Sequence, residues 1–135
     1  MKRFALLALP PLLAACATPA GQLTDADFKW EQATVSATPA QVFRGVMERA
    51  RRCGSFGKGI PDGQFYPDIS EQTIDLYLVG AMFQARNDHV LGRVVIAAAG
   101  DGATRVRAGV QPYYTRSVTG ADLVRLATDP ASPCS

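Results

Sequence analysis

The chain has 135 residues, and its 14 Lys and Arg against 12 Asp and Glu give a formal net charge of +2. Two of the basic residues, Lys2 and Arg3, lie at the N-terminus, so the rest of the chain holds 12 basic and 12 acidic residues. This balance argues against a nucleic-acid partner, because such binding needs a clustered positive excess that neutralises phosphates.

The first 16 residues have the pattern of an export segment. Lys2 and Arg3 precede a short apolar stretch, and Leu13-Ala14-Ala15 lead up to Cys16. A basic start, an apolar centre and small residues before a cleavage site are typical of a secretory signal peptide. The apolar stretch is also shorter than the roughly 20 residues that a membrane-spanning helix needs.

Leu13-Ala14-Ala15-Cys16 resembles the lipobox of bacterial lipoproteins. The resemblance implies that residues 1–15 are removed and that Cys16 becomes an acylated N-terminus, carrying palmitate-type chains that contact membrane lipid. Two or more acyl chains give stable anchoring, whereas one holds only marginally. In that family Asp after the cysteine favours the inner membrane; because Ala17 follows here, the resemblance implies the outer membrane of a Gram-negative envelope, with the domain facing the periplasm. An ordinary signal peptide with a chance cysteine is the alternative.

Removal of residues 1–15 from the 135-residue chain leaves 120 residues, enough for one domain with a core but not for two. Residues 16–27 are small, polar and turn-prone, which predicts a lipidated N-terminus followed by a flexible tether. The alternative is a tail packed on the domain, although Leu23 is the only large apolar residue in it. Residues 28–135 are expected to form the single domain.

Three cysteines are an odd number for an exported chain, and acylation of Cys16 resolves this, because Cys53 and Cys134 remain as a pair. A disulfide between them can persist in an oxidising envelope compartment. Two unpaired thiols are the alternative. A metal site is not indicated, since there is no C-x-x-C motif and the single histidine cannot complete a zinc set.

The main helix is predicted from residue 39 to residue 53. Thr38 and Gln41 have the spacing of a capping box, Pro39 suits the first helical position, and Gly54 ends the helix. An apolar stripe at helical spacing follows, formed by Val42, Phe43, Val46, Met47, Ala50 and Cys53. The opposite side carries Gln41, Arg44, Glu48, Arg51 and Arg52, which we interpret as a solvated face with internal salt bridges. A patch that binds anions or lipid headgroups is the alternative interpretation.

Alternating patterns predict strands over residues 28–36, 73–79, 90–98 and 103–111. Gly100-Asp101-Gly102 indicates a tight hairpin turn between the last two, with Val106 and Val110 toward the core. A short strand near residues 64–66, a bend at Gly80 and a turn at residues 87–88 are also expected. A second, short helix is predicted from Thr119 to about residue 129.

This order (β-α-β-β-β-α) predicts an α+β domain, with a small antiparallel sheet of about four strands, the main helix packed on one face and a short C-terminal helix. The mature part also resembles small proteobacterial lipoproteins with this element order and a cysteine at the end of the first helix. That resemblance implies no specific function.

Residues that invite a catalytic or ligand-binding reading have simpler explanations. The glycines at residues 54–59 lack the spacing and the Ser or Thr of a phosphate-binding loop. His89 has no partner beside it in sequence and fits an exposed turn. Trp30, Tyr113 and Tyr114 are interpreted as partly buried aromatics, with a recognition surface as the alternative.

The sequence therefore predicts a non-catalytic envelope lipoprotein, without cofactor or metal, that contacts other envelope components through its domain. A small carrier of apolar ligands or lipids, with a cleft between helix and sheet, is the alternative. A filled core with an exposed aromatic edge favours the first function, and a ligand-sized cavity favours the second.

Overall fold

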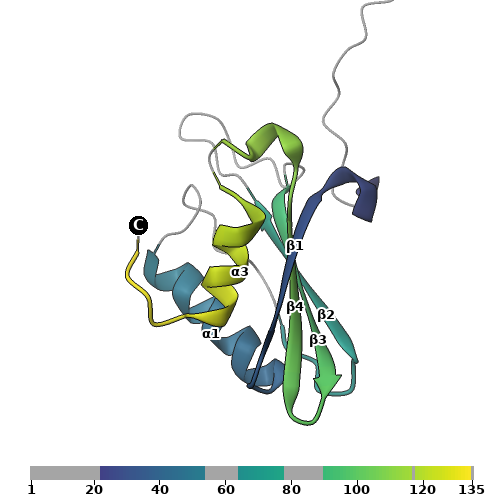
Figure 1. Cartoon of the computed structure of the whole chain (residues 1–135), viewed down its shortest axis with the longest axis vertical. Coiled ribbons are helices and arrows are strands. Elements are labelled where there is room, and N and C mark those ends of the chain that lie inside the picture. Colours follow the sequence, from purple (N-terminus) through teal and green to yellow (C-terminus); the bar gives the residue numbers. More distant parts are fainter. Residues whose placement is uncertain (1–21, 54–63, 78–89, 117, 135) are drawn as a thin grey trace, which may run out of the picture.

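The computed structural model describes residues 22–53, 64–77, 90–116 and 118–134 (Figure 1). With η marking a 3-10 helix, the elements in chain order are η2 (Asp25–Asp27), β1 (Lys29–Val35), α1 (Pro39–Cys53), β2 (Glu71–Tyr77), β3 (Val90–Gly100), β4 (Ala103–Val110), η3 (Pro112–Tyr114) and α3 (Gly120–Thr128). The predicted α+β order is confirmed. The predicted strands differ from the observed ones by at most two residues at the ends that the structure describes.

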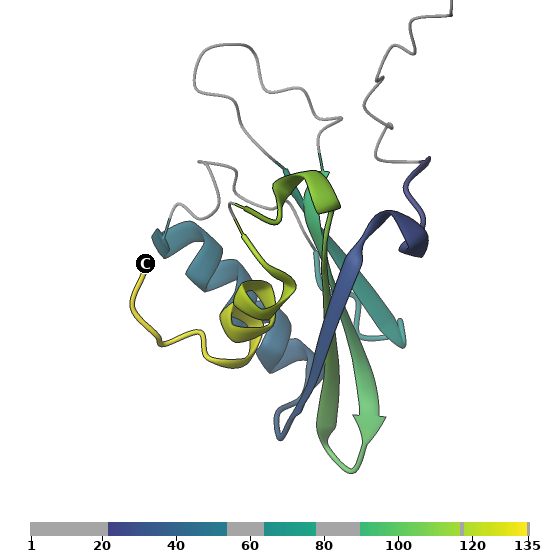
Figure 2. The ribbon, with the colours of Figure 1, turned by 45° about the horizontal axis from the view of Figure 1, so that its top comes forward.

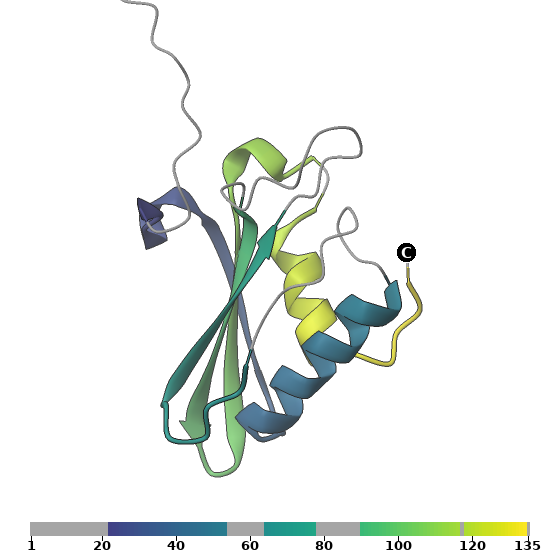
Figure 3. The same ribbon diagram turned by 180° about the vertical axis from the view of Figure 1, so that it is seen from behind.

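The four strands form one antiparallel sheet in the order β1-β4-β3-β2. Both helices lie on the same side of this sheet (Figures 2 and 3). The short helix α3 packs mainly on β1 and β4, and α1 packs on α3 and on β3 and β4. The core fills the space between the helices and the sheet, and its largest fully buried side chains are Ile74, Leu91, Ile96, Leu123 and Leu126.

The α1 helix begins as the sequence predicts. The side-chain oxygen of Gln41 accepts a hydrogen bond of 2.9 Å from the backbone N–H of Thr38, and the Thr38 hydroxyl accepts one of 3.3 Å from the N–H of Gln41. These reciprocal bonds satisfy donors that the first turn leaves open. The predicted stripe is buried at Val42, Val46 and Ala50, so it is the face that contacts the core.

The β3–β4 hairpin also forms at the predicted turn. Asp101 and Gly102 have φ values of 48° and 73°, which are the left-handed conformations that a two-residue type I′ turn requires. In β4, Val106 and Val110 are fully buried, whereas Arg105 is exposed. The alternation therefore fixes which face of the sheet meets the helices.

A glycine in β3 lets α3 approach the sheet closely. A Cβ atom on Gly92 would lie 2.8 Å from both the carbonyl oxygen of Gly109 and the Cδ1 of Leu123. Leu123 is fully buried in the core. The short C-terminal helix is thus a core element that covers β1 and β4, and it stands between much of the sheet and α1.

Some expectations about chain organisation differ from the structure or lie outside the described residues. Residues 64–66 form no strand; instead the Tyr66 backbone bonds to the Gln72 side chain. The packed domain begins at Leu23 rather than at residue 28, because Leu23 is buried against Phe28 and Val90 and is followed by η2. The last two residues of the strand predicted over 73–79, the bend at Gly80 and the turn at residues 87–88 fall in a range that the structure does not describe.

Candidate functional site

The predicted disulfide is confirmed. Cys53 is the last residue of α1, and it is joined to Cys134 in the C-terminal tail with a Cα–Cα distance of 5.3 Å. The two residues are 81 positions apart, so the bond closes a loop that contains most of the domain. Structural disulfides form and persist mainly in oxidising compartments.

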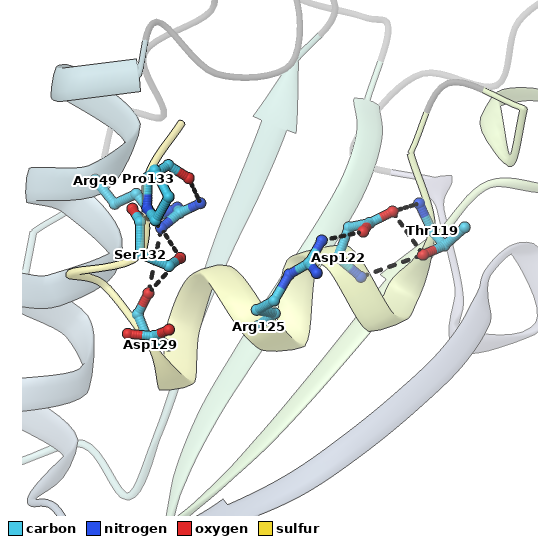
Figure 4. A network of polar contacts seen from close by, with 7 residues as sticks. All are labelled: Arg49, Thr119, Asp122, Arg125, Asp129, Ser132 and Pro133. Atoms are coloured by element: carbon cyan, nitrogen blue, oxygen red, sulfur yellow. Dashed lines mark hydrogen bonds and ion pairs between the residues drawn. The ribbon is translucent and has the colours of Figure 1, made fainter. Parts of the chain in front are cut away.

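A buried arginine, whose role the sequence did not predict, holds the same tail. Arg49 is 8% exposed, and its guanidinium donates hydrogen bonds to the backbone oxygens of Asp129, Ser132 and Pro133, at 3.2, 2.7 and 3.1 Å, and to the Ser132 hydroxyl (Figure 4). We call these contacts the tail clamp. The sequence marks Arg49 as unusual, because this charged residue interrupts the apolar stripe three residues after Val46.

Arg52 also departs from the solvated role that was expected for it. Its guanidinium donates to the backbone oxygens of Pro130 and Ser132, although the side chain stays exposed. The tail passes close to α1 at Gly45, where an added Cβ would lie 3.0 Å from Pro130. Two arginines and the disulfide therefore bind the tail to α1, which is a structural use of these charges rather than an anion site.

The N-terminus of α3 carries a second polar cluster with a structural role (Figure 4). The Asp122 carboxylate accepts hydrogen bonds from the Thr119 backbone N–H at 3.0 Å and from its hydroxyl at 2.7 Å, and it pairs with Arg125 at 2.8 Å. The hydrogen bonds from the Thr119 side chain and backbone hold the pKa of Asp122 below its usual range. This capping box starts the helix at the predicted residue.

A surface groove of about 430 Å³ lies beside the first turn of α1. Its walls come from the start of α1, from the end of β3 and from the segment before β2, and its lining residues are Thr38, Pro39, Ala40, Phe65, Pro67, Asp68, Ile69, Ser70 and Ala98. The groove is mostly apolar, and Ile69 is 52% exposed in its wall. The groove lies beside the N-terminal end of α1. The cleft of a carrier was expected elsewhere, between the helix and the sheet.

A buried glutamine builds one wall of this groove. Gln72 is 6% exposed, and its side-chain amide accepts from the Tyr66 N–H at 3.2 Å and donates to the Tyr66 carbonyl oxygen at 2.7 Å. The Gln72 amide thus makes the hydrogen bonds to the Tyr66 backbone that a neighbouring strand would otherwise make. Phe65 then packs against Phe43 of α1, with ring centroids 5.7 Å apart. These contacts therefore hold one wall of the groove in a defined conformation.

On the sheet face opposite the helices, arginines lie over aromatic rings. Arg93 makes a bidentate ion pair with Asp75, at 2.6 and 2.9 Å, and lies 5.2 Å from the centroid of the Phe28 ring. Arg107 lies 4.5 Å from the ring of Trp30 and pairs with Asp25 at 3.1 Å. These contacts cover part of the open sheet face, and the Asp75 carboxylate is engaged by Arg93.

The three aromatics weighed as a recognition surface differ in environment. Trp30 is half-buried, and its indole N–H donates to the Asp25 carbonyl oxygen at 2.8 Å. Tyr114 is half-buried against the core, and burial raises its pKa. Tyr113, in contrast, is 86% exposed. Only Tyr113 is free to contact another molecule with most of its ring.

The remaining candidates lie outside the described residues. These are the lipidation site Cys16, the histidine His89 and the glycine-rich stretch at residues 54–59. Within residues 22–53, 64–77, 90–116 and 118–134, no group of three His, Cys, Asp or Glu side chains has the arrangement of a metal site. In the same part of the chain, no helix has the length and apolar character needed to cross a membrane.

No known protein family, curated protein or solved structure matches the chain. The features of the described structure that bear on function are the disulfide, the tail clamp, the groove and Tyr113.

Proposed function

We propose that this protein is a lipid-anchored lipoprotein of the bacterial cell envelope, located at the outer membrane, whose domain contacts other envelope components without catalysis. The observation that carries the proposal is the disulfide between Cys53 and Cys134. It indicates an oxidising compartment, and it occupies both cysteines of the domain. Cys16 is then the one cysteine left for acylation, at the position where the lipobox resemblance requires it.

The roles of the buried polar side chains support a non-catalytic domain. Arg49, Gln72 and Thr104 are the buried polar or charged residues among those described, and each binds backbone groups. The Thr104 hydroxyl, for example, donates to the Ala37 carbonyl oxygen at 2.6 Å. Such contacts fix loops and the tail, whereas a catalytic group needs a free acid, base or nucleophile directed at a substrate.

The groove supports contact with a partner more than enclosure of a small ligand. Pockets that carry small ligands bury most of the ligand surface, roughly 70–90% of it. Here Pro67, Asp68, Ile69 and Ser70 are all exposed along one wall, and the described apolar side chains between helices and sheet pack together in one buried cluster. An exposed apolar wall of this kind fits a segment of a partner laid along the surface.

The anchor is tested by replacing Cys16 with Ser. The expected result is loss of acyl labelling and release of the protein from the membrane fraction. Mass analysis of the N-terminal peptide from the unchanged protein should show an acylated Cys16 and no residues 1–15. Continued membrane residence of the Cys16→Ser variant would contradict the anchor.

The contact function is tested by photo-crosslinking in living cells. A photoreactive residue at Ile69, in the groove wall, is compared with one at Arg105, which is exposed on the opposite sheet face. We expect a reproducible crosslink to one envelope component from position 69 and none from position 105. The absence of crosslinks from both positions would count against the contact function.

A carrier function is the second candidate, because the groove has the volume of a small-ligand site. It predicts that protein purified under mild conditions retains an apolar ligand in native mass spectrometry. The Gln72→Leu variant, which loses the bonds that hold the groove wall, should then lose the ligand. A ligand-free mass in both samples would exclude the carrier.

A further inference from the structure

One end of the sheet brings together the start of the domain and its most exposed aromatic residue. Lys29, the first residue of β1, pairs with Val110, the last residue of β4. The helix η2 immediately precedes β1 and η3 immediately follows β4, so the two lie at the same end of the sheet (Figure 1). We call this end, with η2 and η3, the tether end of the domain.

The chain is fixed to the domain from Leu23 onward. Leu23 is buried with Phe28 and Val90, and the Trp30 indole holds the Asp25 carbonyl oxygen. From Cys16 to Leu23 the chain advances seven residues, which span at most about 25 Å when fully extended. An acyl chain on Cys16 therefore keeps the tether end within about 25 Å of the lipid surface.

Tyr113 is presented at this end on a rigid support. Pro112 fixes the backbone before it, and the Tyr114 N–H donates to the Gln111 carbonyl oxygen at 2.9 Å. The Tyr114 ring packs on the core and meets Tyr113 edge to face, with centroids 5.1 Å apart. Tyr113, which is 86% exposed, is thus held out from the described part of the domain. Tyrosine is enriched at membrane–water interfaces, because its ring is apolar and its hydroxyl is polar.

Among the residues that the structure describes, the charges at the tether end are close to balanced. The acidic residues of η2 are Asp25, which pairs with Arg107, and Asp27; the exposed basic residues are Lys29 and Arg116. The bonds from the Thr24 backbone and side chain lower the pKa of Asp27, so this residue stays ionised near neutral pH. A strong attraction to anionic lipid is therefore not expected, and contact would depend on the tyrosine and on the short tether.

We propose that the tether end docks on the phospholipid surface to which Cys16 is anchored, with the Tyr113 ring among the headgroups. This inference rests on the proposed lipid anchor. Anchoring makes the contact intramolecular, so a single aromatic ring with little affinity of its own is held at high effective concentration. The groove at the other end of the sheet then faces away from the membrane.

The test uses the full acylated chain in phosphatidylcholine vesicles whose acyl chains carry bromine, a short-range quencher of tryptophan. Trp30 is replaced by Phe so that it does not contribute emission, and a single tryptophan is placed at Tyr113. The matched control places it at Tyr66, which is 49% exposed in the segment before β2, near the opposite end of the sheet. Circular dichroism and the intact disulfide confirm that each variant is folded.

We expect the tryptophan emission of Tyr113→Trp to be mostly quenched by the brominated lipid and to shift to the blue. The emission of Tyr66→Trp should be the same in vesicles with and without bromine. The loss at position 113 should persist in high salt and without anionic lipid. Equal quenching by bromine at positions 113 and 66 in an acylated sample would overturn the docking and leave the anchor standing. A sample without acyl chains on Cys16 would overturn both.

A second measurement needs no change at Trp30. Lactoperoxidase iodinates exposed tyrosines, and it is too large to enter the headgroup layer. The ratio of iodine on Tyr113 to iodine on Tyr66 should fall several-fold from the released Cys16→Ser chain to the anchored chain. An unchanged ratio contradicts the docking.

Discussion

Arg49→Lys is the substitution that tests most directly how the C-terminal tail is held. The change keeps the positive charge and most of the apolar stem, but it replaces a planar fork of donors with a single ammonium. In the structure the fork donates to backbone oxygens of three residues, Asp129, Ser132 and Pro133, and to the Ser132 hydroxyl. One ammonium group cannot reach all of them in the same geometry.

The expected cost follows from the number and type of bonds lost. A hydrogen bond to a charged group contributes about 1.5–3 kcal/mol to stability, and a buried acceptor left without a donor adds a penalty. Lysine can still make some of these hydrogen bonds, so we expect the free energy of unfolding to fall by about 2 kcal/mol. The disulfide, which closes a loop of 81 positions, contributes about 4.5 kcal/mol in the chain-entropy model and keeps the tail nearby in the variant.

The measurement is urea unfolding followed by circular dichroism, in the Cys16→Ser chain with its disulfide intact. The matched control is Arg44→Lys, because Arg44 lies on the same helix but is exposed. We expect the control to change stability by less than about 0.5 kcal/mol. Amide exchange at Ser132, whose N–H bonds to Asp129, should accelerate only in Arg49→Lys. Equal stability of the two variants would refute the clamp.

Three further substitutions test the contacts that shape the domain. Gly92→Ala puts a methyl group 2.8 Å from Leu123 and should lower the free energy of unfolding by about 1–3 kcal/mol in urea titration; unchanged stability would contradict the close approach of α3. Thr119→Ala removes the hydroxyl that bonds Asp122 and should cost about 1 kcal/mol. Because the pKa of Asp122 is lowered in the folded protein, its stabilising effect is present above the unfolded pKa of about 3.9 and is lost as pH falls through the folded value. Carboxyl NMR should therefore show that pKa rising in Thr119→Ala, and an unmoved pKa would argue against the capping box. Gln72→Leu should accelerate amide exchange at Tyr66 while leaving β3 and β4 protected. The same exchange rate at Tyr66 in the variant and in the unchanged protein would show that another contact holds the groove wall.

The sequence predicted the elements that depend on neighbouring residues. The start of α1 follows from Thr38, Pro39 and Gln41, and the hairpin follows from Gly100-Asp101-Gly102, because each signal acts within one turn of chain. The pairing of Cys53 with Cys134 followed from compartment and cysteine count rather than from spacing. The lipobox at Cys16 stays a prediction.

The contacts that the sequence did not predict are made between residues far apart in the chain. The partners of Arg49 lie 80 or more positions away, so a helical pattern marks the residue as unusual without naming what it binds. Leu23 is buried because η2 and the Trp30 indole turn the chain back onto the sheet, which a polar composition does not reveal. The groove likewise depends on Gln72 taking the place of a strand that residues 64–66 do not form.

The antiparallel sheet separates the two proposed contacts of the domain. β1 runs for seven residues from the tether end toward the end with the hairpin, a distance of about 20 Å at the rise of an extended strand. The groove lies near that far end, because Ala98 of its lining pairs with Thr104, and Thr104 pairs with Val35 at the end of β1. Docking of Tyr113 on lipid therefore leaves the groove open, and it sets the height of the groove above the membrane. A partner fixed in the envelope at that height would be lost from an undocked domain, whereas a freely diffusing partner would still bind. The crosslink from position 69, measured with and without Tyr113→Ala, separates these two kinds of partner.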